Sequence, residues 1–112
     1  MTRIFQHKAA AAGGWQKFSI LEQMGNIGSE VSRANHWQGK DKERFWSAVE
    51  RALELFDLTL EDPRWGGARL REIALAREVF CDAVYGGKFY KSSLSDLVPY
   101  FDQFALAVRK KI

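Results

Sequence analysis

Charged residues occupy positions in this chain where a helical pattern calls for apolar ones. Arg77 lies on an otherwise apolar helical stripe, and Glu50 and Asp57 share a stripe with apolar residues of the preceding helical segment. Because an unpaired charge in a core is very costly, we expect Arg77 to pair with Asp57 or Glu50. Two further carboxylates complete a predicted buried polar cluster, which consists of Arg77, Asp57, Glu50, Glu30 and Asp82.

This predicted cluster has two interpretations. Ion pairs within a core often fix how helices pack, and we favour this structural role. The alternative is an internal pocket that binds a small molecule or carries out a reaction. Because the sequence shows no nucleophile with a base beside it, it favours a protein without enzymatic activity.

The histidines give no indication of a metal site. Helical bundles that hold two metal ions use Glu-x-x-His pairs. This chain has only His7 and His36, and no glutamate precedes either of them at that spacing. We therefore expect neither a metal nor another cofactor.

Two stretches of the chain combine basic and aromatic residues. The first comprises Arg33, His36, Trp37 and Lys40, and the second comprises Tyr85, Lys88, Phe89, Tyr90 and Lys91. In an up-and-down bundle the first and third connections lie at the same end, so the two stretches can form one surface. Aromatic rings beside cations suit single-stranded nucleic acid, and the same residue types dominate protein interfaces. A third interpretation is that these rings only close the end of the bundle.

The composition is that of a water-soluble globular domain. Among 112 residues, 17 are basic and 14 are acidic, which gives a net charge of +3. This small excess permits a nucleic-acid partner without strongly indicating one. Cys81 is the only cysteine, and no run approaches the ~18 apolar residues of a membrane span. We expect a cytoplasmic protein with no membrane partner.

Hydrophobic periodicity predicts four helices, and capping residues indicate where several of them begin. Ser19 with Glu22 three residues later is the pattern of a capping box, before a helix that ends near residue 37. Asp41 is suited to cap the second helix. A third helix follows residues 65–67, and Ser93 with Asp96 marks the start of a fourth.

Prolines and glycines predict where these helices stop. Pro63 ends the second helix, and the glycine pair at 86–87 ends the third. Pro99 either kinks the fourth helix or marks its start. Short connections make successive helices antiparallel, so the sequence predicts an all-α, up-down-up-down four-helix bundle over residues 15–112. We expect a flexible N-terminal arm over residues 1–14.

Small residues follow one side of the first predicted helix. Gly25, Gly28, Ser29 and Ser32 would let another backbone approach closely, either a neighbouring helix or a second subunit. Phosphate binding by these glycines is disfavoured, because phosphate-binding glycine loops normally join a strand to a helix and no strand is predicted here.

Three segments carry a resemblance to known proteins: residues 25–31 (GNIGSEV), 50–59 (ERALELFDLT) and 77–82 (REVFCD). The chain resembles, from about residue 18 to residue 109, a widespread family of small, uncharacterised prokaryotic helical proteins. This resemblance implies a helical fold and a cytoplasmic setting. The chain is more loosely similar to HEPN-type bundles. Their catalytic arginine and histidine are separated by four to six residues, a spacing that neither Arg3 with His7 nor Arg33 with His36 matches.

Together these patterns favour a non-enzymatic protein-interaction module that forms a homo-oligomer. Four tryptophans and eight phenylalanines exceed what one small core easily holds. We expect the excess, with Trp15, Trp37 and Trp65 as candidates, to lie exposed at an interface. The alternative is an accessory protein that binds RNA or DNA through the basic and aromatic surface, and a pocket around Arg77 is a weaker alternative.

Overall fold

The computed structural model describes residues 14–110, which form four α-helices after a single turn of 3-10 helix, η1 (Gly14–Lys17). The helices are α2 (Ile20–Trp37), α3 (Lys42–Leu60), α4 (Gly67–Val84) and α5 (Leu94–Lys110). No residue of the described range is in a strand. The predicted all-α four-helix bundle is confirmed. Residues 1–13 of the predicted N-terminal arm lie outside the described residues, and Gly14 begins η1.

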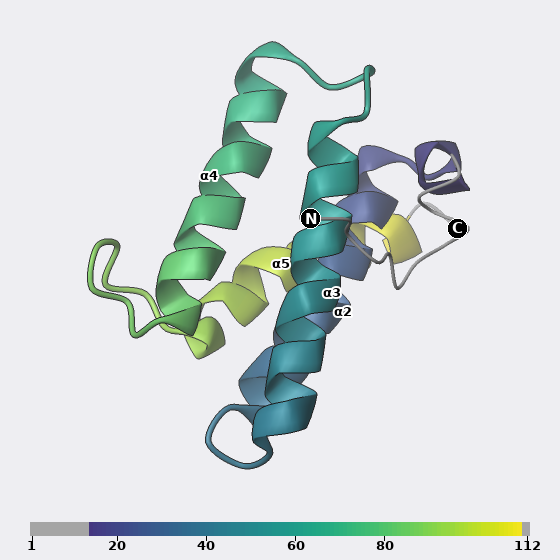
Figure 1. Ribbon diagram of the computed structural model, residues 1–112. Helices are drawn as coiled ribbons and strands as arrows, with labels where there is room; N and C mark the ends of the chain where they lie inside the picture. The colour runs from purple at the N-terminus through teal and green to yellow at the C-terminus, as the bar shows by residue number, and fades with distance from the viewer. Residues whose placement is uncertain (1–13, 111–112) are drawn as a thin grey trace, which may run out of the picture.

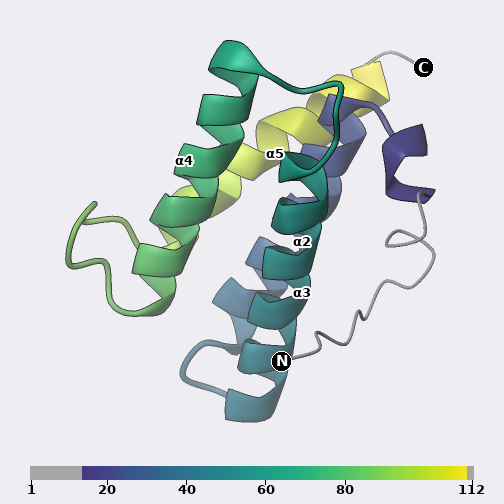
Figure 2. The ribbon, with the colours of Figure 1, turned by 45° about the horizontal axis from the view of Figure 1, so that its top comes forward.

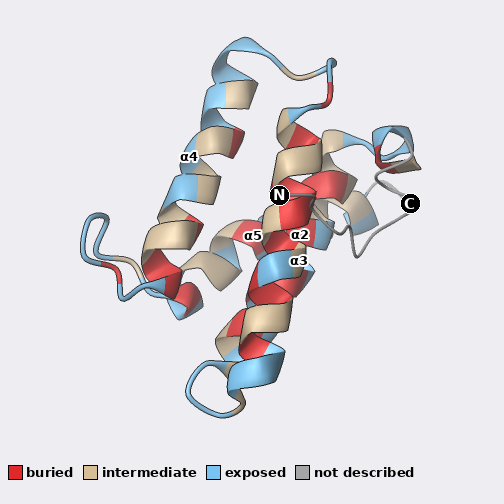
Figure 3. Cartoon of the chain, in the orientation of Figure 1, coloured by how far each residue is buried: buried red, intermediate tan, exposed pale blue. Residues whose placement is uncertain are grey.

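Helix α2 is the central element of the bundle. It runs antiparallel to α3 and packs along both α3 and α5, whereas α4 makes smaller contacts with α3 and α5 (Figures 1 and 2). The buried residues of α4 face α3 and α5, and the opposite side of α4 is exposed (Figure 3). The loop that follows α4 projects away from the other helices (Figure 1). Consequently the outer side of α4 and the loop after it are exposed among the described residues.

Capping side chains begin three of the helices as predicted. Ser19 Oγ accepts a hydrogen bond from the Glu22 amide at 3.2 Å, and Glu22 Oε1 accepts one from the Ser19 amide at 3.1 Å. Asp41 Oδ1 accepts from the amide of residue 44 at 3.1 Å. Ser93 and Asp96 form the same reciprocal pair before α5. These bonds satisfy donors that helix geometry leaves unpaired.

The end of α4 and the start of α5 bear on two further predictions, which concern the glycine pair and Pro99. Gly86 and Gly87 end α4 with φ of 107° and 70°, a backbone region that favours glycine. Helix α5 begins at Leu94 and includes Pro99, so the alternative in which the helix starts at Pro99 is wrong. Pro99 lies in the first half of α5, and the helix continues past it for eleven residues.

The glycines of α2 lie against α5. A Cβ atom placed on Gly28 would lie 2.6 Å from Cβ of Phe101, and one placed on Gly25 would lie 3.6 Å from the backbone of Ala105. The predicted close approach of a neighbouring helix is therefore confirmed, and the neighbour is α5. This contact explains why α2 and α5 share so much of their surface.

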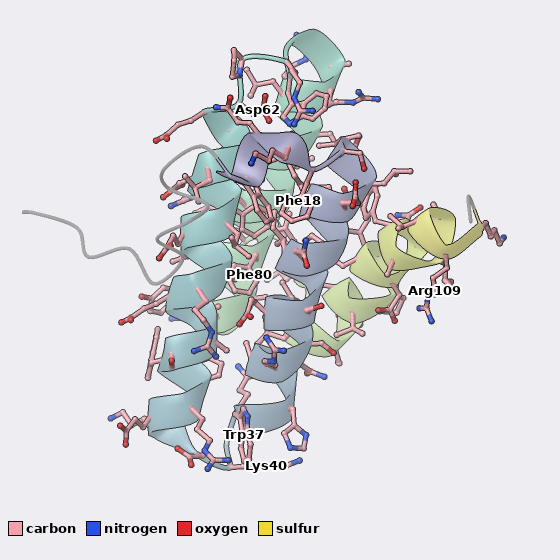
Figure 4. All side chains as sticks on the ribbon, turned by 90° about the vertical axis from the view of Figure 1, so that its right-hand side faces the viewer. Phe18, Trp37, Lys40, Asp62, Phe80 and Arg109 are labelled. Atoms are coloured by element: carbon pink, nitrogen blue, oxygen red, sulfur yellow. The ribbon has the colours of Figure 1, made fainter. Side chains whose placement is uncertain are left out.

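Aromatic rings fill the centre of the core. Phe56 of α3 packs against Phe80 of α4 and Phe101 of α5, with ring centroids 5.8 Å and 6.0 Å away. All three side chains are fully buried, and Figure 4 shows Phe80 between the helices. A single side chain of α3 thus packs against both α4 and α5.

The expectation of exposed tryptophans is wrong. Trp15 is only 4% exposed, and Trp37, Trp46 and Trp65 are half-buried and packed against the core. The core holds more aromatic surface than composition suggested because η1 folds Trp15 under the end of the bundle. No helix of the described range is long and apolar enough to cross a membrane.

Candidate functional site

Arg77 pairs with Asp57, which is one of its two predicted partners. Arg77 Nε donates to Asp57 Oδ1 at 2.9 Å and joins α4 to α3. The two side chains are 34% and 27% exposed, so this ion pair lies at the edge of the core. At such an exposure it is worth at most about 1 kcal/mol. An ion pair at this position can fix how α3 and α4 pack against each other.

The other members of the predicted buried polar cluster are engaged elsewhere. Glu30 is buried and accepts hydrogen bonds from Arg33 and from Arg51 Nε, the latter at 2.9 Å. Asp82 binds backbone amides of the loop after α4. Glu50 is exposed, so its predicted burial is wrong. The apolar stripe that contains Glu50 reaches the surface here because α4 covers only part of α3.

The most buried polar network was not predicted from the sequence. Asp62 is 1% exposed, and its carboxylate accepts from Gln23 Nε2 at 3.0 Å and from Arg64 Nη2 at 2.7 Å. Gln23 Oε1 accepts from Trp65 Nε1 at 2.8 Å, and Trp15 Nε1 donates to a buried threonine of α3. This network ties η1, α2 and the α3–α4 turn together. Figure 4 shows Asp62 at one end of the molecule, with Trp37 and Lys40 at the other.

The hydrogen bonds of this network determine the pKa of Asp62. The Arg64 side chain, together with the Arg64 amide and Gln23, holds the pKa of Asp62 at about 2 although burial acts in the opposite direction. Asp62 is therefore ionised at neutral pH and serves as an acceptor, not as a general acid. We therefore assign this network the role of stabilising the folded state.

The loop between α4 and α5 is held in one conformation by side chains of α4. Asp82 Oδ1 accepts from the Phe89 amide at 3.1 Å, and Asp82 Oδ2 accepts from the Tyr90 amide at 2.9 Å. The Tyr90 hydroxyl donates to Glu78 Oε2 at 2.9 Å. Lys91 adopts a left-handed backbone conformation with φ of 61°, which is uncommon for a residue other than glycine. This loop is a built structure with a fixed shape.

The same loop exposes aromatic side chains to solvent. Phe89 is 87% exposed, Tyr85 is 72% exposed and Tyr90 is 44% exposed. Lys88 and Lys91 flank these rings and are also exposed, so most of the loop appears pale blue in Figure 3. The second basic and aromatic stretch therefore lies exposed on one loop, which we call the aromatic loop (residues 85–91).

The first stretch does not present its aromatic ring in this way. Trp37 is half-buried, with the Arg44 guanidinium 4.7 Å above its ring and the His36 ring edge-on at 4.6 Å. Arg33 is paired with Glu30. The α2–α3 connection, which carries Lys40, and the aromatic loop lie apart in Figures 1 and 2. The described side chains therefore leave aromatic rings strongly exposed only in the second stretch.

Replacing Asp82 by alanine tests whether α4 holds the aromatic loop. We expect at least tenfold faster amide hydrogen exchange at Phe89 and Tyr90, because each amide loses the carboxylate oxygen that accepts its hydrogen bond. The free energy of unfolding should fall by only about 1 kcal/mol, since the bonds are exposed. Nuclear magnetic resonance exchange rates measure the effect, with Asp102→Ala on exposed α5 as the control. Unchanged exchange in Asp82→Ala would show that other contacts fix the loop.

An apolar groove lies between α4 and α5. It has a volume of about 200 Å³ and is lined by Glu72, Leu75, Ala76, Val79, Leu97, Tyr100 and Phe101. Leu75 is 50% exposed there. The Tyr100 hydroxyl donates to Glu72 Oε1 at 2.9 Å, and burial with this hydrogen bond raises the pKa of Tyr100. Tyr100 therefore stays protonated, and the α4–α5 groove carries a single carboxylate at its edge.

A second groove, of about 310 Å³, opens between α3 and α4. Its lining includes Trp46, Glu50, Cys81 and Tyr85, and Arg77 Nη1 lies 3.8 Å from Cys81 Sγ. Burial raises the pKa of the Cys81 thiol, which keeps it in the unreactive protonated form. This α3–α4 groove is the cavity that the small-molecule hypothesis would need, but its thiol is a packing group.

Among residues 14–110, no group of three or more histidine, cysteine, aspartate or glutamate side chains is placed to hold a metal ion. Comparisons of the chain with protein-family models, with curated protein sequences and with solved structures give no significant match.

Proposed function

We propose that this chain is a non-enzymatic protein-interaction module that binds a second copy of itself. The observation that carries the proposal is Phe89, a large apolar side chain that is 87% exposed on a loop of fixed shape. Exposing such a ring to water is unfavourable by about 2 kcal/mol relative to burying it, and aromatic anchors dominate the energetics of interfaces. Association would therefore be favoured by the free energy of burying the Phe89 side chain.

The fixed shape of the aromatic loop supports the same proposal. A loop ordered before binding loses little conformational entropy when it docks. The loop also contains Lys91 in a left-handed conformation, and such strained residues gather at functional sites. Further, we propose a cytoplasmic setting, which suits a chain with one cysteine and no possible internal disulfide.

A second candidate function is the binding of single-stranded nucleic acid by the aromatic loop. It is favoured by the exposed cations Lys88 and Lys91 on either side of Phe89 and Tyr90. Stacking on these rings together with phosphate contacts would give an affinity that falls steeply with salt. Association through an apolar side chain should be far less sensitive to salt. Salt dependence therefore separates the two candidates.

Size-exclusion chromatography with light scattering tests the proposed function. We expect wild-type protein to show the mass of at least two chains at micromolar concentrations, at both low and high salt, and an absorbance spectrum free of nucleic acid. Phe89→Ala should shift the protein toward the monomer, since one anchor is lost. Leu106→Ala, which removes a 50% exposed apolar side chain from α5, should not. A nuclease-sensitive peak rich in nucleic acid would favour the second candidate, and a monomer at all concentrations would overturn self-association.

A further inference from the structure

We propose that two copies of the chain associate by reciprocal insertion, in which Phe89 of each copy enters the α4–α5 groove of the other. This inference rests on the self-association proposed above and identifies the two surfaces that carry it. One surface is a protruding ring and the other is an apolar recess. Neither is covered by the rest of residues 14–110 of the same copy.

The protruding surface is preorganised. Both carboxylate oxygens of Asp82 hold the backbone at residues 89 and 90, and Glu78 holds the Tyr90 hydroxyl. These bonds fix the loop at the C-terminal end of α4, while the Phe89 side chain stays 87% exposed. Phe89 is therefore held away from the groove of its own copy and is available to another.

The recess has the size and polarity that a phenyl ring requires. Its volume is about 200 Å³, and apolar cavities of about 150 Å³ are large enough to bind benzene. Leu75, Ala76 and Val79 line one wall from α4, and Leu97 and Phe101 line the other from α5. Half of the Leu75 side chain is exposed, so an inserted ring would remove both its own surface and that of Leu75 from water.

The charges around the two surfaces are complementary. Glu72 lines the groove, and Glu78 is exposed on α4; each lies three residues from the groove residue Leu75, so the two carboxylates flank it along the helix. The aromatic loop carries Lys88 and Lys91 beside Phe89. Insertion brings these cations toward carboxylates, whereas the phosphates of a nucleic acid would meet the carboxylates unfavourably. These two carboxylates thus favour as the occupant a second copy, which brings cations with its ring.

A two-fold arrangement allows both insertions at once. The groove uses residues 72–79 of α4, and the aromatic loop begins at residue 85, directly after the same helix. When two copies of α4 cross antiparallel about a two-fold axis, each loop is carried toward the groove of the partner. The association then closes as a dimer and does not propagate.

A mixing experiment with two variants tests this inference. Phe89→Ala removes the ring and keeps the groove, and Leu75→Glu places a charge in the groove and keeps the ring. Each variant alone should dissociate at least about tenfold more readily than wild type, because both insertions are lost. An equimolar mixture should form a heterodimer, since one intact ring meets one intact groove. Leu106→Glu, at the same 50% exposure on α5 but outside this groove, should dimerise like wild type.

Sedimentation velocity of the single variants and of their mixture gives the readout. Heterodimer in the mixture, at concentrations where each variant alone is monomeric, supports reciprocal insertion. A mixture that stays monomeric, or a Leu75→Glu variant that dimerises like wild type, overturns it while leaving self-association intact. A monomeric wild type overturns both the inference and the proposed function.

Discussion

Asp62→Ala is expected to lower the free energy of unfolding by about 3 kcal/mol at neutral pH. The substitution leaves the fully buried Gln23 amide without its Asp62 acceptor, and it removes the bonds from the Arg64 amide and guanidinium. A buried donor left unsatisfied costs about 1–3 kcal/mol, and breaking a buried ion pair costs more. The Arg64 side chain is 41% exposed and can return to water, which keeps the estimate moderate.

Urea denaturation at pH 7 measures this effect, with Asp102→Ala as the matched control. Asp102 is an exposed aspartate of α5, so its replacement should change stability by less than about 0.5 kcal/mol. Equal midpoints for Asp62→Ala and Asp102→Ala would contradict the assigned role of the buried network.

The pH dependence of this difference follows from the pKa of Asp62. The folded state holds that pKa at about 2, below the ordinary value of 3.8. A lowered pKa adds stability that is fully present above the unfolded value and is lost as pH falls through the folded value. The stability difference between wild type and Asp62→Asn should therefore shrink by about 2 kcal/mol between pH 6 and pH 2. A constant difference over this range would show that Asp62 is not specifically stabilised as the anion.

Gly28→Ala and Gly25→Ala are expected to change stability in opposite directions. At Gly28 a new Cβ would lie 2.6 Å from Cβ of Phe101, a contact that no rotation of the phenylalanine side chain relieves. Helices α2 and α5 must therefore separate, and overpacking of this kind costs about 1–3 kcal/mol. At Gly25 the nearest atom would be 3.6 Å away, an ordinary contact. Alanine there should stabilise by about 0.5–1 kcal/mol, because it favours the helix.

Thermal and urea denaturation of the two variants provide the comparison, and each variant serves as the control for the other. Both substitutions add one methyl group to the same helix, so helix propensity contributes equally to both. The difference between them isolates the close approach of α5. Equal effects at Gly25 and Gly28 would contradict the packing described for these two helices.

Local sequence patterns predicted most of the fold. The starts of three helices depend on a side chain that binds an amide three residues away, as Ser19, Asp41 and Ser93 do, and short-range chemistry of this kind is visible in a sequence. The small residues of α2 also indicated close packing, because the size of each side chain is visible in the sequence. The choice of α5 as the neighbour depended on how the whole chain folds, and no local pattern carries that information.

Pairing over long distances explains what the sequence did not reveal. Gln23 and Asp62 are 39 residues apart and each reads as a surface residue, yet the turn of chain after α3 places them in one buried network. The Asp62-Pro63 pair was interpreted only as a helix stop. Trp15 was expected at the surface because nothing local indicated that η1 folds against α3. Burial of these groups is a property of the tertiary structure.

The candidate site was predicted in part. Tyr85, Phe89 and Tyr90 were singled out by their types and neighbours, and they are exposed on one loop. Trp37 matched the same pattern of residue types but packs under Arg44 at the far connection. Composition identifies residues suited to an interface, and only the fold decides which of them meet solvent. The α4–α5 groove is formed by side chains of two helices together, so neither helix alone indicates it in the sequence.

The dissociation constant of Phe89→Ala, measured by sedimentation velocity beside that of wild type over a range of concentrations, shows whether Phe89 drives self-association. We expect a wild-type dimer that persists at high salt, and at least about tenfold weaker association in Phe89→Ala with an unchanged circular-dichroism spectrum. Identical association of the two proteins, or a wild type that is monomeric throughout the range, would contradict it.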